Sequence, residues 1–143
     1  MKLTQLSIFA ENKPGHVVGP CRTLAAAGVN LRALSLADTQ HFGILRMIVS
    51  DWQTAAKLLE EAGYLVKATE VVAVRVPNRP GGLLEVLSAL EGTSINIEYM
   101  YSCPEIRGED AILLFRFSDP DAAIQRLQAA GIRLADGEEL LGK

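Results

Sequence analysis

The sequence predicts an α+β protein made of two consecutive βαββαβ units. The first observation is a repeated motif of Asn, a basic residue, Pro and Gly, at residues 12–15 and 78–81. The second is that the similarity continues from Leu24 to Leu90, and from Ala62-Gly63 to Ala130-Gly131. The third is the order of apolar patterns, which repeats within each half. The repeat predicts domains at residues 1–69 and 70–143. The join, residues 68–70, holds no Gly, Pro or Ser run, so we expect the two copies to pack against each other and not to swing on a linker.

The first half of each unit reads as a strand followed by a helix. Apolar residues alternate over 3–10 and 71–76, which predicts strands. After each Pro-Gly pair they recur at helical spacing, and Gly28 ends the first of these helices. Pro20 lies inside that helix, where proline costs about 3 kcal/mol. We therefore expect the helix to begin late, with Pro20 in its first turn, or to open with a distortion, and the first loop to be longer and more mobile than the second.

The second half of each unit reads as two strands, a helix and a short strand. The strands are predicted at residues 31–38, 44–49 and 64–68, and again at 95–101, 112–117 and 132–135. Asp51 and Asp119 stand at expected helix N-caps, and Pro120 suits a first helical position. Gly63 and Gly131 end these helices. The βαββαβ order implies an antiparallel sheet with both helices on one face, the ferredoxin-like arrangement.

Apolar side chains are also expected on the opposite face of the sheets. The alternation places five there: Phe9, Ile44, Ile48, Ile112 and Leu114. Such a cluster on an open sheet predicts a second layer, and we expect a homodimer to supply it.

The composition excludes several classes of function. A net charge of −3 with dispersed Lys and Arg argues against nucleic-acid binding. The chain shows neither an apolar run of about 18 residues nor a signal peptide, so we expect a cytoplasmic protein without a membrane partner. Cys21 and Cys103 lack metal-type spacing and are expected to be reduced thiols. The two histidines, His16 and His41, belong to no catalytic or metal motif, and we expect no enzyme, metal or cofactor. Glu105, Glu109 and Asp110 are expected to form a solvated acidic rim.

The repeated motif has parts that suit a free α-amino acid. Pro presets a turn, and Gly permits positive φ and close approach of a ligand to the backbone. Amide groups just after the Gly would point outward at the positive end of the helix dipole, where a carboxylate fits. The Asn side chain could accept from an ammonium group. The alternative is ordinary turn chemistry, which stays open for Asn30 and Asn96 as well.

The stretches "ENKPGHVVGPCRTLAAAGVNL" and "PNRPGGLLEVLSALEGTSINI", with the βαββαβ order, resemble two ACT domains in tandem. The resemblance covers nearly the whole chain and implies a regulatory protein with an amino-acid site between ACT units. The residues carried over from the first copy are Asn12, Pro14, Gly15, His16, Val17 and Asn30. Those from the second copy are Asn78, Pro80, Gly81, Gly82, Leu83 and Asn96. His16 stands where the second copy has Gly82, so we expect unequal sites, or only one that fills.

Three functions follow as hypotheses. The first is a non-catalytic amino-acid sensor that acts on a partner enzyme of amino-acid metabolism. The second is a ligand-free ACT-type interaction module or regulatory subunit of a metabolic enzyme. The third is a ferredoxin-like hydrolase of the acylphosphatase type, for which Arg79 is the candidate anion-binding residue.

Overall fold

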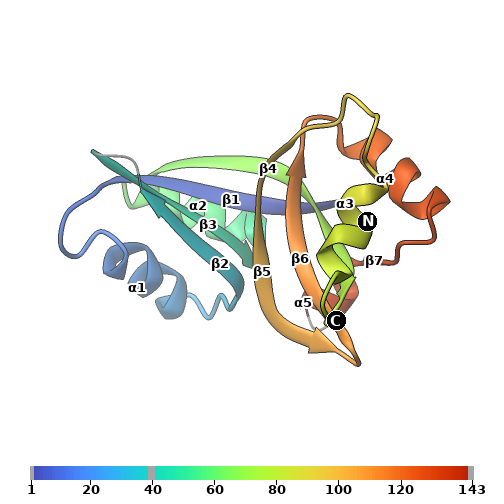
Figure 1. Ribbon diagram of the computed structural model, residues 1–143. Helices are drawn as coiled ribbons and strands as arrows, with labels where there is room; N and C mark the ends of the chain where they lie inside the picture. The colour runs from blue at the N-terminus through green and yellow to red at the C-terminus, as the bar shows by residue number, and fades with distance from the viewer. Residues whose placement is uncertain (1, 39–40, 142–143) are drawn as a thin grey trace. The chain divides into compact units, whose positions relative to one another are not determined.

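The computed structural model describes residues 2–38 and 41–141, without the side chains of 105–107 (Figure 1). The chain divides into two compact units. The first unit is Thr4–Thr69, and the second is Met1–Leu3 with Glu70–Lys143. Each unit is an α+β fold with an antiparallel sheet, which confirms the predicted fold class.

The first unit follows the predicted element order. Its elements are β1 (Lys2–Glu11) from Thr4 onward, α1 (Val18–Ala26), β2 (Leu31–Asp38), β3 (Phe42–Val49), α2 (Trp52–Glu61) and the start of β4 (Leu65–Pro77). The strand order is β2-β3-β1-β4, and β3 is antiparallel to both β1 and β2. This is the order of a ferredoxin-like unit, in which the first and third strands are central.

The second unit repeats this plan and adds a terminal helix. Its elements are the rest of β4, α3 (Gly82–Ser88), β5 (Ile97–Arg107), β6 (Asp110–Phe117), α4 (Pro120–Ala129), β7 (Leu134–Ala135) and α5 (Gly137–Leu141). The strand order is β5-β6-β4-β7, with antiparallel pairs throughout. Helix α5 has no counterpart in the sequence prediction.

The strand β4 replaces two predicted strands. Residues 64–68 and 71–76 were expected to be separate, but residues 65–77 form one 13-residue strand. The segment between them contains no turn-forming residue, and Thr69, Val71 and Val72 are β-branched and favour extended backbone. The last strand of the first unit therefore continues directly into the first strand of the second.

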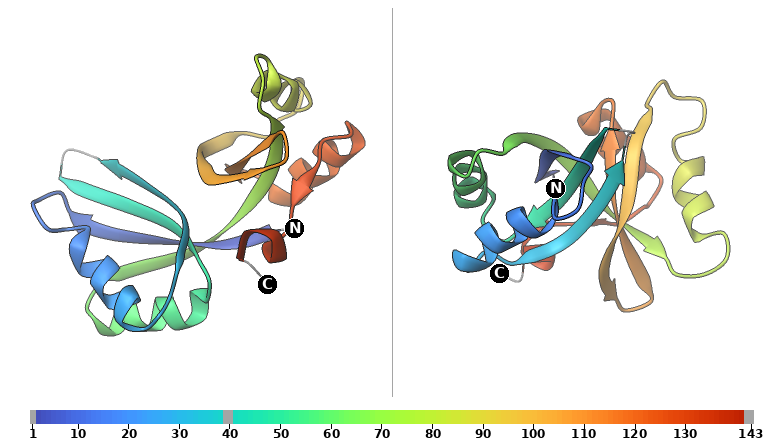
Figure 2. Two further views of the ribbon diagram at one scale, coloured as in Figure 1. Left: turned by 90° about the horizontal axis from the view of Figure 1, so that it is seen from below. Right: turned by 90° about the vertical axis from the view of Figure 1, so that its left-hand side faces the viewer.

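The two helices of each unit cover one face of its sheet (Figure 2), and the core of the unit lies between them. In the first unit, Leu6, Ile8, Leu45 and Met47 of the sheet pack with Leu24 of α1 and with Ala55 and Leu59 of α2. In the second unit, Val72, Val74, Phe115 and Phe117 pack with Val86 of α3 and with Ala123 and Leu127 of α4. Both helices of each unit therefore lie on one face, as predicted.

The helix ends confirm the predicted caps. The Asp51 Oδ1 accepts from the Thr54 amide at 3.2 Å, and the Asp119 Oδ1 accepts from the Ala122 amide at 3.1 Å. Pro120 is the first residue of α4. Gly63 and Gly131 follow the two helices with φ of 93° and 78°.

Helix α1 begins late, as the position of Pro20 predicted. The helix starts at Val18, so Pro20 is its third residue and is buried. In the first turn an amide would have no carbonyl partner within the helix, so the missing donor of proline costs little there. Helix α3 starts at Gly82, which aligns with residue 16, so the first loop is the longer one, as expected.

The apolar residues of the opposite sheet face are buried differently from what was expected. Ile48, Ile112 and Leu114 are at most 2% exposed within the single chain, whereas Phe9 and Ile44 are half-buried. The homodimer expected over this face stays a prediction.

Lys2 joins two segments of the second unit. Its Nζ lies 3.0 Å from Glu70 Oε2 and 3.1 Å from Asp121 Oδ1. The hydrogen bonds to Glu70 and then to Asp121 raise the pKa of Lys2 above its usual 10.5.

Candidate functional site

The loop between β1 and α1 is held by backbone hydrogen bonds. The Asn12 amide donates to the His41 carbonyl at 3.0 Å, which ties the loop to the start of β3. The Lys13 amide donates to Glu11 O at 2.9 Å, and the His16 amide donates to Lys13 O at 3.2 Å. These bonds fix a turn in which the side chain of Asn12 is exposed.

The loop between β4 and α3 repeats the same bonds. The Asn78 amide donates to Glu109 O at 3.0 Å, the Arg79 amide to Pro77 O at 2.9 Å, and the Gly82 amide to Arg79 O at 3.0 Å. Gly15 and Gly81 take the left-handed conformation with φ of 88° and 84°. A Cβ on either would meet no atom within 4 Å, so conformation and not space requires glycine at both.

The amide groups differ from the expectation. The first amide after each of these glycines was predicted to point outward, but those of His16 and Gly82 donate to the carbonyl three residues back. At α3 the next amides, of Leu83 and Leu84, belong to the first turn and have no carbonyl partner within the helix. The side chains of Val17 and Leu83 pack against the cores and anchor the helix starts.

The residue after the left-handed glycine distinguishes the two loops. A Cβ on Gly82 would lie 1.9 Å from Pro77 O, so the backbone itself excludes any side chain there. In the first loop this position is His16, whose Nδ1 donates to Lys13 O at 2.6 Å. Its ring lies over Gly43, where a Cβ would come within 3.1 Å of Cδ2 and Nε2.

Each loop borders a hollow in its own unit. The first hollow, about 440 Å³, is lined by Ala10, Glu11, Lys13, Pro14, Gly15, His16, Gly63 and Tyr64. Tyr64 was not among the predicted site residues. The available signal was its position directly after the helix-ending Gly63, and its separation from the loop in sequence concealed it.

The second loop borders a polar hollow of about 360 Å³. Its lining is Pro77, Asn78, Arg79, Glu109 and Asp110. Asp110 was expected in a solvated rim, but it is 7% exposed and pairs with Arg133. Glu109 is exposed, and the side chain of Glu105 lies outside the described residues.

Arg79 is engaged by a carboxylate. Its Nη2 lies 2.6 Å from Glu85 Oε1. The acylphosphatase alternative requires this guanidinium for an anion, whereas here it is paired with Glu85.

Asn30 and Asn96 lie away from the loops of their own units. The Asn30 amide donates to Ser50 Oγ at 3.2 Å, and the Asn96 amide to Ser118 Oγ at 2.9 Å. Ser50 and Ser118 follow the last residues of β3 and β6, whereas the Asn-x-Pro-Gly loops lie beside the first residues of these strands. A strand of 8 residues, such as β3, spans about 25 Å. Within one unit the structure therefore does not bring either Asn together with the predicted loop residues.

Other predicted features have simple positions. His41 is exposed, Cys103 is buried and Cys21 is half-buried, and neither cysteine forms a disulfide within the described residues. Over residues 2–38 and 41–141, no cluster of His, Cys, Asp or Glu could hold a metal ion. No helix in the same residues is long and apolar enough to cross a membrane.

The family model for the ACT domain pair matches residues 1–140. The chain belongs to this family. A crystal structure of protein BT0572 from Bacteroides thetaiotaomicron has 38% identity and a TM-score of 0.91, with 100% of this chain and 98% of that chain covered. No curated protein is significantly similar in sequence.

Two further structures resemble the ACT domain pair in fold. The regulatory subunit of aspartate kinase from Thermus thermophilus, in a ligand-free form, has 18% identity and a TM-score of 0.63, with 89% of this chain and 91% of that chain covered. E. coli aspartokinase III in complex with lysine and aspartate has 18% identity and a TM-score of 0.52, with 90% of this chain but 30% of that chain covered.

Proposed function

We propose that this ACT domain pair is a non-catalytic regulatory protein that binds a free amino acid at its strand-to-helix loops. The observation that carries the proposal is that both loops share one hydrogen-bond pattern and one left-handed glycine, at Gly15 and Gly81. In the second unit the Leu83 and Leu84 amides are donors for a carboxylate. The exposed Asn78 side chain supplies an acceptor for an ammonium group.

The two loops should differ in affinity. His16 and Lys13 place a ring and a cationic chain beside the first hollow. In the second loop the position of His16 is taken by Gly82, which has no side chain, and Arg79 is paired with Glu85. We infer that one loop fills at lower amino-acid concentration than the other.

Regulation then acts through a shift between two states. An amino acid that binds one of the two states more tightly increases the population of that state. The contact of the protein with a partner enzyme changes as a result. The fold resemblance to proteins described as regulatory subunits of aspartate kinase supports a partner enzyme of amino-acid metabolism. We further propose a homodimer in the cytoplasm. Leu34 and Leu36, about half exposed on edge strand β2, offer an apolar surface for it.

A thermal-melt screen against the twenty amino acids tests the proposal. At 100 times its dissociation constant, a ligand stabilises the folded state by about 2.7 kcal/mol. Calorimetric titration of the responding amino acid follows, with Gly15→Ala and Gly81→Ala. Gly28→Ala and Gly92→Ala are matched controls because both have positive φ and open space but lie outside the loops.

The loop variants should weaken binding at least tenfold while the controls match the wild type. Equal binding in all four variants would remove the loops from the site. A flat screen would favour the second hypothesis, a ligand-free interaction module, and size-exclusion chromatography with light scattering would then examine its assembly.

A further inference from the structure

The two units fill one equivalent space differently. In the first unit, Tyr64 reaches from the end of α2 to helix α1. A Cβ on Gly19 would lie only 2.1 Å from the Tyr64 hydroxyl oxygen, so the hydroxyl occupies the space that a side chain at Gly19 would need. The ring packs against the core of the unit. A phenol therefore closes the space between α1 and the segment after α2.

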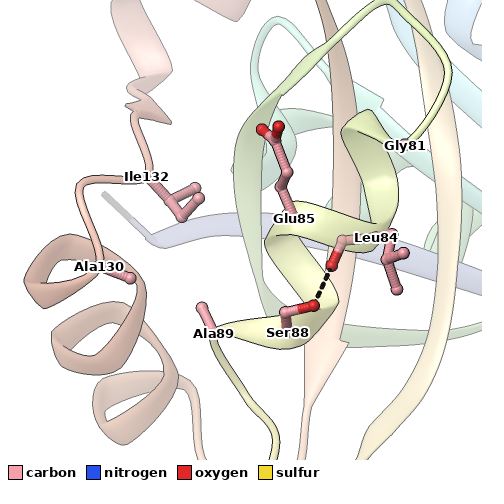
Figure 3. A pocket seen from close by; sticks show the side chains of 7 residues that line it. All are labelled: Gly81, Leu84, Glu85, Ser88, Ala89, Ala130 and Ile132. Carbon is pink, nitrogen blue, oxygen red and sulfur yellow. Dashed lines mark hydrogen bonds between the residues drawn. The ribbon is translucent and has the colours of Figure 1, made fainter.

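In the second unit the same space is open. The aligned residues are Glu85 in place of Gly19 and Ile132 in place of Tyr64. The side chain of Ile132 is shorter than that of Tyr64, and it lines a solvent-open hollow of about 570 Å³, a volume within the range of small-molecule sites. Its lining is Gly81, Leu84, Glu85, Ser88, Ala89, Ala130 and Ile132. Figure 3 shows Glu85 and Ile132 facing each other across it.

The polar groups of this hollow accept hydrogen bonds. Ser88 donates its one hydroxyl proton to Leu84 O at 2.7 Å, so its Oγ can only accept from a ligand. The Arg79 Nη2 donates to Glu85 Oε1 at 2.6 Å, and the other carboxylate oxygen of Glu85 can accept from a ligand. A ligand must therefore bring a donor to this end.

A cation stands at the other end. An adjoining hollow of about 290 Å³ shares Ser88, Ala89 and Ala130 and adds Arg126. The Arg126 Nε donates to Ala89 O at 3.1 Å, which holds the guanidinium beside the hollow. Its terminal N–H groups suit a carboxylate.

We propose that this hollow of the second unit binds a small hydroxyaryl carboxylic acid. The ring occupies the space that the Tyr64 ring fills in the first unit. The hydroxyl donates to Glu85, and the carboxylate meets Arg126. The site lies between α3 and the segment after α4. It borders the proposed amino-acid site and shares Gly81 and Leu84 with it.

The probe for the test is 4-hydroxyphenylacetate. Its binding to the full chain is measured by calorimetry and by the shifts of amide NMR signals. Ala130→Leu is the blocking variant because Ala130 is exposed, so the added side chain enters the hollow without disturbing the core. Ala62→Leu is its matched control at the aligned, exposed end of α2. We expect saturable binding, weakened at least tenfold by Ala130→Leu and unchanged by Ala62→Leu.

A second variant rebuilds the closed space of the first unit. Glu85→Gly with Ile132→Tyr should abolish probe binding and leave the NMR spectrum of the first unit in place. Phenylacetate lacks the hydroxyl of the probe, and p-cresol lacks its carboxylate. Each should bind at least fivefold more weakly than the probe.

Three results would overturn the proposal: absence of saturable binding at millimolar probe, equal losses in Ala130→Leu and Ala62→Leu, or equal affinity for all three compounds. The proposed amino-acid site fails independently. Its signature is loss in Gly15→Ala, and Ala130→Leu should leave that binding unchanged.

Discussion

Gly82 is the position at which a single methyl group should do most damage to the second loop. A Cβ there would lie 1.9 Å from the Pro77 carbonyl oxygen and 2.9 Å from its carbon, whereas ordinary contact begins at 3.4 Å. Gly82→Ala must therefore separate the end of β4 from the start of α3 by roughly 1.5 Å. Both groups are backbone, so no side chain can rotate away.

The cost can be estimated from overpacking. Forced insertion of a methyl group into a packed site costs about 1–3 kcal/mol, and a backbone clash belongs at the upper end. Alanine recovers up to about 1 kcal/mol of helix propensity. We expect a net loss of about 2–3 kcal/mol, or roughly 6–10 °C in melting temperature for a chain of this size.

Two glycines in the same unit serve as controls. Gly81→Ala and Gly131→Ala meet no atom within 4 Å, but their φ angles of 84° and 78° impose about 1 kcal/mol of backbone strain. Urea unfolding followed by circular dichroism measures all three variants. If Gly82→Ala is no more destabilising than Gly81→Ala, the reasoning from the Pro77 carbonyl is refuted.

Three further predictions concern charged groups. Asp119→Ala should lower the free energy of unfolding of α4 and its unit by about 1 kcal/mol in urea unfolding, and Asp119→Ser should restore most of it. Arg133→Gln should cost about 1–2 kcal/mol in the same assay because it leaves the buried Asp110 carboxylate without its partner; an unchanged midpoint would contradict this. The raised pKa of Lys2 gives a contribution that is complete below pH 10.5 and is lost as pH rises through the folded-state pKa. Lys2→Gln and wild type should therefore have parallel stability profiles from about pH 6 to 9 and differ in slope only above about pH 10.5.

Local chemistry explains which elements the sequence predicted well. The Asp51 and Asp119 caps use a side chain and an amide three residues apart, so a short window contains both partners. The left-handed Gly15 and Gly81 likewise depend on the turn in which they stand. Such features need no knowledge of the tertiary structure.

Features that depend on distant partners were beyond sequence reasoning. Asp110 is acidic and lies next to a hairpin tip, which suggests exposure, but Arg133, 23 residues further on, makes its burial tolerable. The contact of Tyr64 with Gly19 joins residues that are far apart in the chain. Helix α5 was missed because its five residues are too few to display a period.

The differences between the two copies come in compensating pairs. His16 is large and lies over Gly43, whereas the second copy has Gly82 and Ala111 at the aligned positions. The first copy also pairs Tyr64 with Gly19, and the second pairs Ile132 with Glu85.

In the first copy each pair couples a side chain to the space that receives it, so Gly43 and Gly19 cannot gain a side chain while His16 and Tyr64 keep theirs. Gly43→Ala alone forces the His16 ring to move, but it should cost less when His16→Gly has removed the ring. In the first unit, the pairs His16–Gly43 and Tyr64–Gly19 both lie near the start of helix α1, where the loop borders the first hollow. The duplication therefore kept the backbone of the loops and changed the walls around them, as expected if the copies now present different sites to different ligands.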